Sequence, residues 1–180
     1  IRAEPNRTII TGTQVTSVGL VAETVGGAEN GKASCSYNWM GSLQKFYDTF
    51  STIHKQAGPQ ALNLIAGTYN IPIVCKDVAG NEASSQISFS IEVDSKAPEV
   101  RRVYNSGGSL YLITDEDSEC RYGFARCGFN WENGTQMAGI QKEHSAAWDS
   151  GKTYYIRCID MWKNYPSTTN CSIIARPTDV

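Results

Sequence analysis

The chain has 180 residues, with 16 Lys and Arg against 18 Asp and Glu. This near-balanced charge gives no argument for a nucleic-acid partner, and no apolar run approaches the roughly 18–20 residues that a membrane-spanning helix needs. Six cysteines, an even number in a chain long enough for two small domains, favour disulfides and an oxidising compartment.

The first half of the chain alternates short β-strand patterns with turn residues. Residues 1–12 are polar and contain Pro5, which predicts a lead-in or an edge strand. Residues 43–53 are ambiguous, because the spacing of their apolar side chains fits a short helix or an irregular strand. Clearer strand patterns, in which apolar and polar residues alternate or β-branched residues gather, cover residues 14–24, 33–39, 67–77 and 86–93.

One pattern occurs twice, which predicts a tandem repeat. Gly, Tyr, Cys, Asp and Asn follow one another in the stretch from Gly67 to Asn81, and the same order returns from Gly151 to Asn164. The second copy is one residue shorter between its Gly and its Cys. Each copy reads as a strand followed by a tight turn.

The second half repeats the order of the first. Residues 94–98 are short and polar and end in a proline, so they predict a linker. Beyond them, Cys120 matches Cys35, and His144 precedes its central strand as His54 does. We therefore expect two domains, residues 1–95 and residues 96–180. Strands are expected at residues 100–104, 110–114 and 119–124.

Short strands at close spacing, with turn residues between them, predict an all-β fold of two tandem antiparallel β-sandwich domains. The stretch from Leu64 to Asn81, with its Gly-x-Tyr and Asp-x-Ala-Gly-Asn segments, resembles fibronectin type III domains and immunoglobulin-like domains of bacterial or archaeal surface proteins. The stretch from Trp148 to Asn164 matches more loosely, since Lys163 stands in the place of Gly80. The resemblance implies that the glycine and tyrosine form a corner before the sixth strand. It also implies an extracellular, cell-surface location.

The repeat pairs the cysteines within each domain. Cys35 with Cys75, and Cys120 with Cys158, occupy equivalent strands, which leaves Cys127 and Cys171 to pair by elimination. The resemblance implies that the first two bridges join neighbouring strands of one sheet. A metal site is the alternative for these cysteines, and the sequence disfavours it because no Cys-x-x-Cys or Cys-x-x-His spacing occurs.

No catalytic residue, metal or cofactor is predicted. His54 and His144 are the only histidines, and without a nucleophile partner they are better interpreted as structural hydrogen-bonding residues. A calcium site is the alternative interpretation of the acidic turns, but no Asp-x-Asp-x-Asp-Gly loop is present and turn capping by the carboxylates is favoured. The acidic residues concerned are Asp77, Asp115, Glu116, Asp117, Glu119 and Asp160.

Aromatic residues gather in the second half and suggest a surface for stacking carbohydrate rings. Trp148 is expected in the core, Trp162 is expected to be exposed at the tip of a turn, and Trp162 and Tyr165 are the candidate ligand contacts. Trp131 belongs to the same group. Three Asn-x-Ser/Thr triplets offer candidate glycosylation sites at Asn6, Asn133 and Asn170.

These features favour a non-catalytic structural or adhesion module of an extracellular or cell-surface protein. One alternative is a glycan- or protein-binding module that acts through exposed loops of the second domain. Another is a filament subunit in which residues 8–11 add as a strand to the sheet of a neighbouring copy, although these residues are more simply interpreted as the first strand of their own domain. The expected partners are other copies of the chain, neighbouring surface domains and glycans, with no nucleic acid and no membrane insertion.

Overall fold

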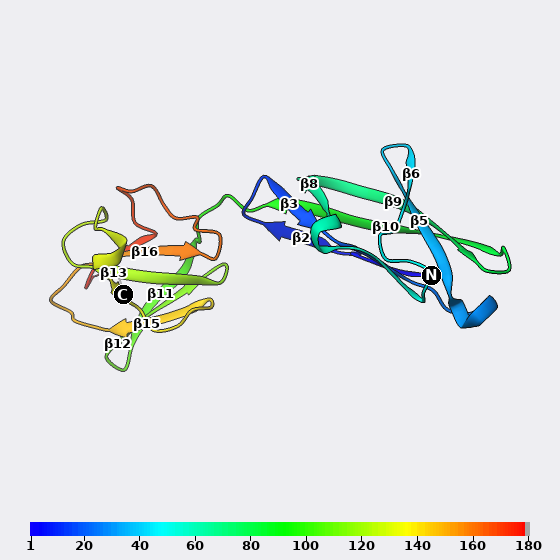
Figure 1. The fold of residues 1–180 in the computed structure, drawn as a ribbon. Coiled ribbons are helices and arrows are strands. Elements are labelled where there is room, and N and C mark those ends of the chain that lie inside the picture. The colour runs from blue at the N-terminus through cyan, green and yellow to red at the C-terminus, as the bar shows by residue number, and fades with distance from the viewer. Residues whose placement is uncertain (179–180) are drawn as a thin grey trace. The chain divides into compact units, whose positions relative to one another are not determined.

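A computed structural model describes residues 1–178 of the chain. The chain divides into two compact units, Ile1–Asp94 and Ser95–Val180, which we call domain 1 and domain 2 (Figure 1). The division falls one residue before the expected boundary. Among the described residues, no helix is long and apolar enough to cross a membrane. The helices are the short 3₁₀ turns η1 (Ala28–Gly31), η2 (Gly58–Gln60) and η3 (Trp131–Asn133).

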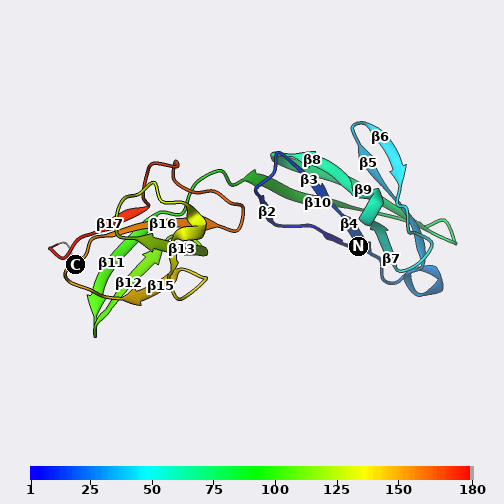
Figure 2. The same ribbon diagram turned by 60° about the vertical axis from the view of Figure 1, so that its left-hand side comes forward.

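Domain 1 is an antiparallel β-sandwich, so the predicted fold class is confirmed. Its larger sheet has the strand order β2-β10-β9-β5-β6, and its smaller sheets have the orders β1-β4-β7 and β3-β8. The long strands β9 and β10 lie side by side in both ribbon views (Figures 1 and 2). The strands are β1 (Arg2–Glu4), β2 (Thr8–Thr11), β3 (Val15–Val18), β4 (Leu20–Glu23), β5 (Ala33–Trp39), β6 (Ser42–Lys45), β7 (Ile53–Gln56), β8 (Leu62–Ile65), β9 (Gly67–Asp77) and β10 (Glu82–Val93).

The core of domain 1 follows from the alternation of its strands. In β9, Ile71, Ile73 and Cys75 are buried while the residues between them are exposed, because successive side chains of a strand point to opposite faces. Leu20 and Ala22 of β4 belong to the same buried cluster. Full burial of each isoleucine contributes roughly 1.5–3 kcal/mol, so the cluster can stabilise a small sandwich.

The N-terminal residues belong to domain 1. Strand β2 runs parallel to β10, with Thr8 opposite Ser90 and Thr11 opposite Val93, and Ile9 packs against the core. Residues 8–11 therefore form an edge strand of their own domain. Their backbone groups on the β10 side are paired within the domain.

The ambiguous residues 43–53 form no helix. Their first residues continue β6, and the Phe46 backbone N–H donates to the Cys35 carbonyl oxygen at 3.1 Å, beyond the end of that hairpin. The Phe46 ring is buried edge-on against Tyr37, with 5.2 Å between ring centroids. Pairing with β5 thus overrides the helix-like spacing of the aromatic residues, and the helical alternative is wrong.

The described part of domain 2 has two sheets, with fewer strands than domain 1 has, and most of them are labelled in Figure 2. Its sheets have the orders β11-β12-β15 and β14-β13-β16-β17. In both domains a central antiparallel pair sets two cysteines directly opposite each other, Cys35 with Cys75 and Cys120 with Cys158. The strands are β11 (Val100–Ser106), β12 (Ser109–Thr114), β13 (Ser118–Gly123), β14 (Thr135–Gln136), β15 (Glu143–Ala147), β16 (Tyr154–Asp160) and β17 (Ile173–Ala175).

A tyrosine near the start of the central strand forms a corner in each domain, but the two tyrosines are not in equivalent register. The Tyr69 hydroxyl donates to the Ile65 carbonyl oxygen at 2.8 Å. Tyr154 donates to the Ala147 carbonyl oxygen at 2.7 Å and is fully buried. Counted from the cysteine, however, Tyr154 stands where domain 1 has Ile71. Tyr154 thus stands two positions nearer its cysteine than Tyr69 does, on the same face of the strand, and lies in the core rather than at its edge.

The two domains differ most in the loops at one face of the central pair. In domain 1 the connections after β5 and β9 are short, residues 40–41 and 78–81. In domain 2 the corresponding connections are residues 124–134 and 161–172. The third disulfide, Cys127–Cys171, joins these two longer loops. It has no counterpart in domain 1.

Candidate functional site

The longer loops of domain 2 cover the outer face of its sheet. Ile156 and Cys158 of β16 point into the core, so Arg157 and Ile159 point outward, yet only 5% and 9% of their surfaces are exposed. The residues in the same positions of domain 1, Val74 and Lys76, are exposed. The loops thus bury a face that a β-sandwich ordinarily leaves to solvent.

A cavity of about 550 Å³ lies on this face, within the range typical of small-ligand pockets. Phe129 and Trp131 line it from the first loop, Lys163 and Tyr165 from the second, and Arg157 from strand β16. Tyr165 was one of the two candidate ligand contacts. Trp162, the other, is half-buried and does not line the cavity, and the expectation that it is exposed is wrong.

The first loop holds its aromatic rings in fixed positions. The Phe129 ring lies against Gly123 and Gly134, and a Cβ atom at Gly134 would come within 2.5 Å of it. The Arg121 guanidinium donates to the Trp131 carbonyl oxygen at 3.2 Å and lies 5.2 Å from the Trp131 ring centroid. Together with the disulfide, these contacts fix the loop against the sheet.

Arg157 carries the unusual electrostatics of the cavity. Its Nη1 donates to the Phe129 carbonyl oxygen at 3.1 Å, and its guanidinium carbon lies 5.8 and 5.4 Å from the ring centroids of Phe129 and Tyr165. Its Nε is buried without a hydrogen-bond partner. No carboxylate pairs with Arg157 among the ion pairs of the described residues.

Arg121 stands directly opposite Arg157 in the β13–β16 pair but, unlike Arg157, it has carboxylate partners. Its Nε donates to Glu119 at 2.9 Å, and its Nη1 lies 3.8 Å from Glu132. Like charges directly opposite each other destabilise a sheet unless they are compensated. One arginine of the pair is compensated within the protein, and the other faces the cavity.

Sequence reasoning missed most of this site. Phe129, Arg157 and Lys163 were not singled out, because an arginine at an outward strand position is typical of a solvent-exposed side chain. A usable signal existed in Cys127 and Cys171. These two cysteines fall in the two connections that are longer than those of the first copy, and a bridge between them predicts that the loops fold together.

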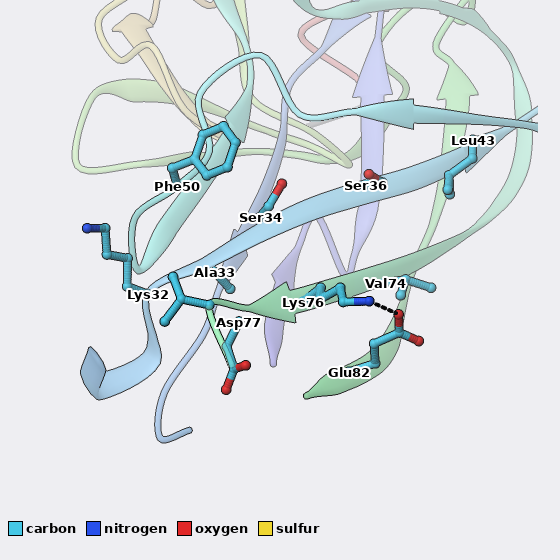
Figure 3. Close-up of a pocket in the computed structure, with 11 residues that line it drawn as sticks. Lys32, Ala33, Ser34, Ser36, Leu43, Phe50, Val74, Lys76, Asp77 and Glu82 are labelled. Atoms are coloured by element: carbon cyan, nitrogen blue, oxygen red, sulfur yellow. Dashed lines mark hydrogen bonds and ion pairs between the residues drawn. The ribbon is translucent and has the colours of Figure 1, made fainter. Parts of the chain in front are cut away.

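Domain 1 has a smaller groove on its outer face, of about 380 Å³. Figure 3 shows Phe50 and Leu43 near its ends, with Ser34 and Ser36 on β5 between them. Lys76 in this groove pairs with Glu82 at 3.3 Å, as Figure 3 also shows. This lysine is therefore compensated within the protein.

The bridges of both central strand pairs are buried. Cys35–Cys75 and Cys120–Cys158 join positions whose Cα atoms lie 4.0 and 4.1 Å apart, and Cys127–Cys171 joins positions 4.9 Å apart. His54 brings a ring nitrogen within 4.8 Å of both sulfurs in domain 1. Because those sulfurs form a disulfide, they are not thiolate ligands for a metal.

Each buried histidine makes hydrogen bonds through both ring nitrogens. His54 contacts Thr24 and Thr49 at 3.0 and 2.9 Å, and His144 contacts Ser118 at 3.0 Å and the Gly139 carbonyl oxygen at 3.3 Å. Burial lowers the pKa of both imidazoles, which favours the neutral form.

The two histidines differ in tautomer. The Gly139 carbonyl can only accept, so the proton of His144 is assigned to Nδ1. Thr24 already donates to the Gly31 carbonyl oxygen at 2.6 Å, so the proton of His54 is assigned to Nε2. Both rings thus serve the packing of their domains.

Acidic side chains cap the turns after β9 and β16. Asp77 accepts from the backbone N–H groups of Ala28, Ala79 and Asn81, each at 2.9 Å. Chiefly the Ala28 N–H, then the Asn81 side chain, lowers the Asp77 pKa to about 2. Asp160 accepts from the Asn164 backbone and side chain, both at 2.8 Å. Both turns therefore have the capping geometry that the sequence favoured.

The other predicted residues lie at the surface or in the core. Trp148 stacks on Tyr154 with 5.1 Å between ring centroids and packs against the core of domain 2, as expected. Asp115 accepts from the Glu99 backbone at 2.8 Å, and Glu119 pairs with Arg121. All three sequon asparagines, Asn6, Asn133 and Asn170, are exposed. Their glycosylation stays a prediction.

Comparison with known proteins returns fold-level likeness. No family model matches the chain, and no curated protein matches it. Fibronectin(III)-like modules of Clostridium thermocellum CbhA are 13% identical, with 94% of this chain and 86% of that chain covered and a TM-score of 0.39. The titin domains z1z2 in complex with telethonin are 10% identical, with 86% of each chain covered and a TM-score of 0.35.

A cytokine receptor complex is 11% identical, with 89% of this chain and 99% of that chain covered and a TM-score of 0.32. At such identities and TM-scores, none of these proteins carries an argument about function. The assignment of an immunoglobulin-like or fibronectin-like sandwich rests on the strand order and the core of each domain.

Proposed function

We propose that this chain is a non-catalytic module of an extracellular protein, serving structure or adhesion. The observation that carries the proposal is the disulfide set: all six cysteines are bridged, two pairs in the cores and one between surface loops. Structural disulfides persist in oxidising compartments. Domains of this size bury a smaller share of their surface than larger domains do, and covalent links offset that deficit.

The proposal of a non-catalytic role rests on the polar groups of the core. His54 and His144 use both ring nitrogens for buried hydrogen bonds and do not line the cavity of domain 2. The cysteine sulfurs are held in disulfides and offer no nucleophile. General acid–base or nucleophilic chemistry needs such groups within reach of a substrate.

Labelling on the parent cells tests the location. A membrane-impermeant amine reagent should label exposed lysines such as Lys55 and Lys163 on intact cells that express the full-length protein. Labelling that appears only after lysis would contradict an extracellular role. Beads coated with the two-domain chain then test adhesion, since they should bind the surfaces of the same cells, whereas beads coated with the reduced and alkylated chain should not.

A second function is favoured by the cavity of domain 2, namely binding of a glycan or a protein through its loops. Aromatic rings held in place by packing present rigid contact area at a small entropic cost. Tyr165→Ala should weaken binding to a glycan array, whereas Met161→Ala, on the same loop but 74% exposed and away from the cavity, should not. Equal binding by both variants would remove the cavity from this function.

The filament alternative has less support. Residues 8–11, its proposed linking strand, pair with β10 of their own domain. Strand addition would have to use the outer edge of β2, or that of β6 at the far side of the larger sheet of domain 1.

A further inference from the structure

The buried guanidinium of Arg157 is the least satisfied polar group of the described chain. Its Nε is the buried side-chain nitrogen that has no partner, and buried polar groups are paired as a rule, with protein, water or ligand. The charge it belongs to also lacks a counter-ion, although a buried charge is stable only when it is paired. The described protein residues thus supply neither an acceptor for the Arg157 Nε–H nor a carboxylate for its charge.

The cavity has a positive electrostatic character. The residues that line it, as far as the described chain shows, include the cations Arg157 and Lys163 and no Asp or Glu. The nearest compensated cation, Arg121, uses Glu119 and Glu132. A ligand that supplies an anion would pair with Arg157 and leave those existing ion pairs intact.

The aromatic residues define the rest of the ligand. Phe129 and Tyr165 lie close to the guanidinium, and Trp131 lines the same cavity. Apolar ring faces beside a planar charged fork suit a small ring that has apolar C–H faces and one anionic substituent. A sugar unit with a carboxylate has both properties. An acidic peptide side chain supplies the anion but has no ring to lie against these side chains.

We propose that the domain 2 cavity binds the acidic sugar unit of a glycan, with its carboxylate on the Arg157 guanidinium and Lys163 at the rim. This inference rests on the ligand-binding function proposed above and names its ligand class. The disulfide Cys127–Cys171 and the glycines under Phe129 hold the loops so that the site exists before the ligand binds.

The Arg157 Nε–H signal in proton–nitrogen NMR gives a direct readout on the full chain. Titration with D-glucuronate and D-galacturonate, at millimolar concentration, should shift this signal, while neutral D-glucose and D-galactose should shift it at concentrations at least tenfold higher. N-acetylglucosamine 6-sulfate distinguishes sulfate from carboxylate as the anion. Blocked diglutamate, acetylated and amidated, represents an acidic protein segment.

Variants separate the charge from the fold. Lys163→Gln, at an exposed side chain, should weaken uronate binding several-fold. Arg157→Lys keeps the charge but loses the planar fork, and it should weaken binding at least tenfold. Met161→Ala should bind as the unmodified chain does. Unchanged uronate affinity in Lys163→Gln and Arg157→Lys, both folded by circular dichroism, would overturn the proposal.

The control ligands distinguish the proposed uronate specificity from the more general ligand-binding function on which it rests. Equal binding of uronates and neutral sugars at Tyr165 would overturn the acidic specificity and leave a glycan-binding function in place. Stronger binding of the sulfated sugar would replace carboxylate by sulfate as the anion and overturn the assignment to a uronate. A shift caused by diglutamate alone would make the partner an acidic protein segment. No shift with any probe, and no binding on a glycan array, would overturn both proposals.

Discussion

Removing the disulfides one at a time separates bridges that stabilise a core from the bridge that shapes the site. The three bridges close chain segments of 40, 38 and 44 residues. On the chain-entropy estimate each restricts the unfolded chain by about 4 kcal/mol. The estimate alone therefore makes the three bridges equivalent, and any difference between them reports on the folded state.

The three bridges differ in how strongly the folded state holds the joined residues without them. Cys35–Cys75 and Cys120–Cys158 join directly opposed residues in the centre of a sheet, so the folded strands stay fixed when the bridge is removed and the full entropic effect should appear. Cys127–Cys171 joins two loops. Without it these loops gain freedom in the folded state too, which cancels much of the effect on the unfolded chain.

Replacing Cys35 and Cys75 by alanine should therefore lower the melting temperature of domain 1 by roughly 15–30 °C, since 1 kcal/mol corresponds to about 4–8 °C in a domain of this size. Replacing Cys127 and Cys171 should lower that of domain 2 by a clearly smaller amount. Hydrogen exchange followed by mass spectrometry assigns each loss to its strands. In every variant the unaltered domain serves as the internal control.

The same experiment connects stability to the site. In the Cys127→Ala/Cys171→Ala variant, amides of residues 124–134 and 161–172 should lose protection while those of β13 and β16 keep it. A melting temperature of domain 2 lowered as much in this variant as in the Cys120→Ala/Cys158→Ala variant would refute the distinction between the bridges. The distinction would also be refuted if the loops kept their protection without the bridge.

Three further predictions test the turns, the corner and the N-terminal strand. The pKa of Asp77 is lowered from 3.8 to about 2. Asp77 therefore stabilises domain 1 above pH 4 and loses that effect as the pH falls toward 2, because the unfolded state then binds the proton more readily. Asp77→Asn should flatten this part of the pH–stability curve, and an unchanged curve would contradict the prediction. Tyr154→Phe removes the hydrogen bonds of the tyrosine hydroxyl with Ala147 and Asp149. The free energy of unfolding of domain 2, measured by urea denaturation, should fall by about 1–3 kcal/mol. An unchanged free energy of unfolding would contradict a structural role of this corner. Deleting residues 1–12 exposes the edge of β10, so it should destabilise domain 1 and promote self-association, which analytical sedimentation measures. A truncated chain that stays monomeric with unchanged stability would contradict the role of β2 in covering that edge.

The fold and the central bridges were accessible from the sequence because they repeat. A motif that occurs twice, with its cysteine in line with apolar residues, fixes which strands are equivalent and which face is buried. Cys35 and Cys120 were matched to each other on this ground, and the structure sets each opposite its partner in the same sheet. The pairing needed no knowledge of the loops.

The site was not accessible in the same way, because it depends on how loops cover a sheet. Alternation in β16 places Arg157 outward but cannot show that residues from two distant loops bury it. Trp162 was favoured as a contact because it stands in a turn, whereas the structure half-buries it and brings Tyr165, three positions later, to the cavity. Local patterns thus predict the direction of a side chain, and only packing decides its environment.

The two domains differ in what covers the outer face of the sheet that holds the central strand pair. Domain 1 keeps short turns over its outer sheet face, and the lysine there is compensated by Glu82. In domain 2 the same face carries Arg121 opposite Arg157, and the protein provides carboxylates for Arg121 alone. If Arg157 served only stability, an apolar residue such as the valine at the same position of domain 1 would do so at lower electrostatic cost. The long loops, their own disulfide and the uncompensated arginine occur together in one copy and are absent together from the other, which is the distribution expected of parts of a single binding site.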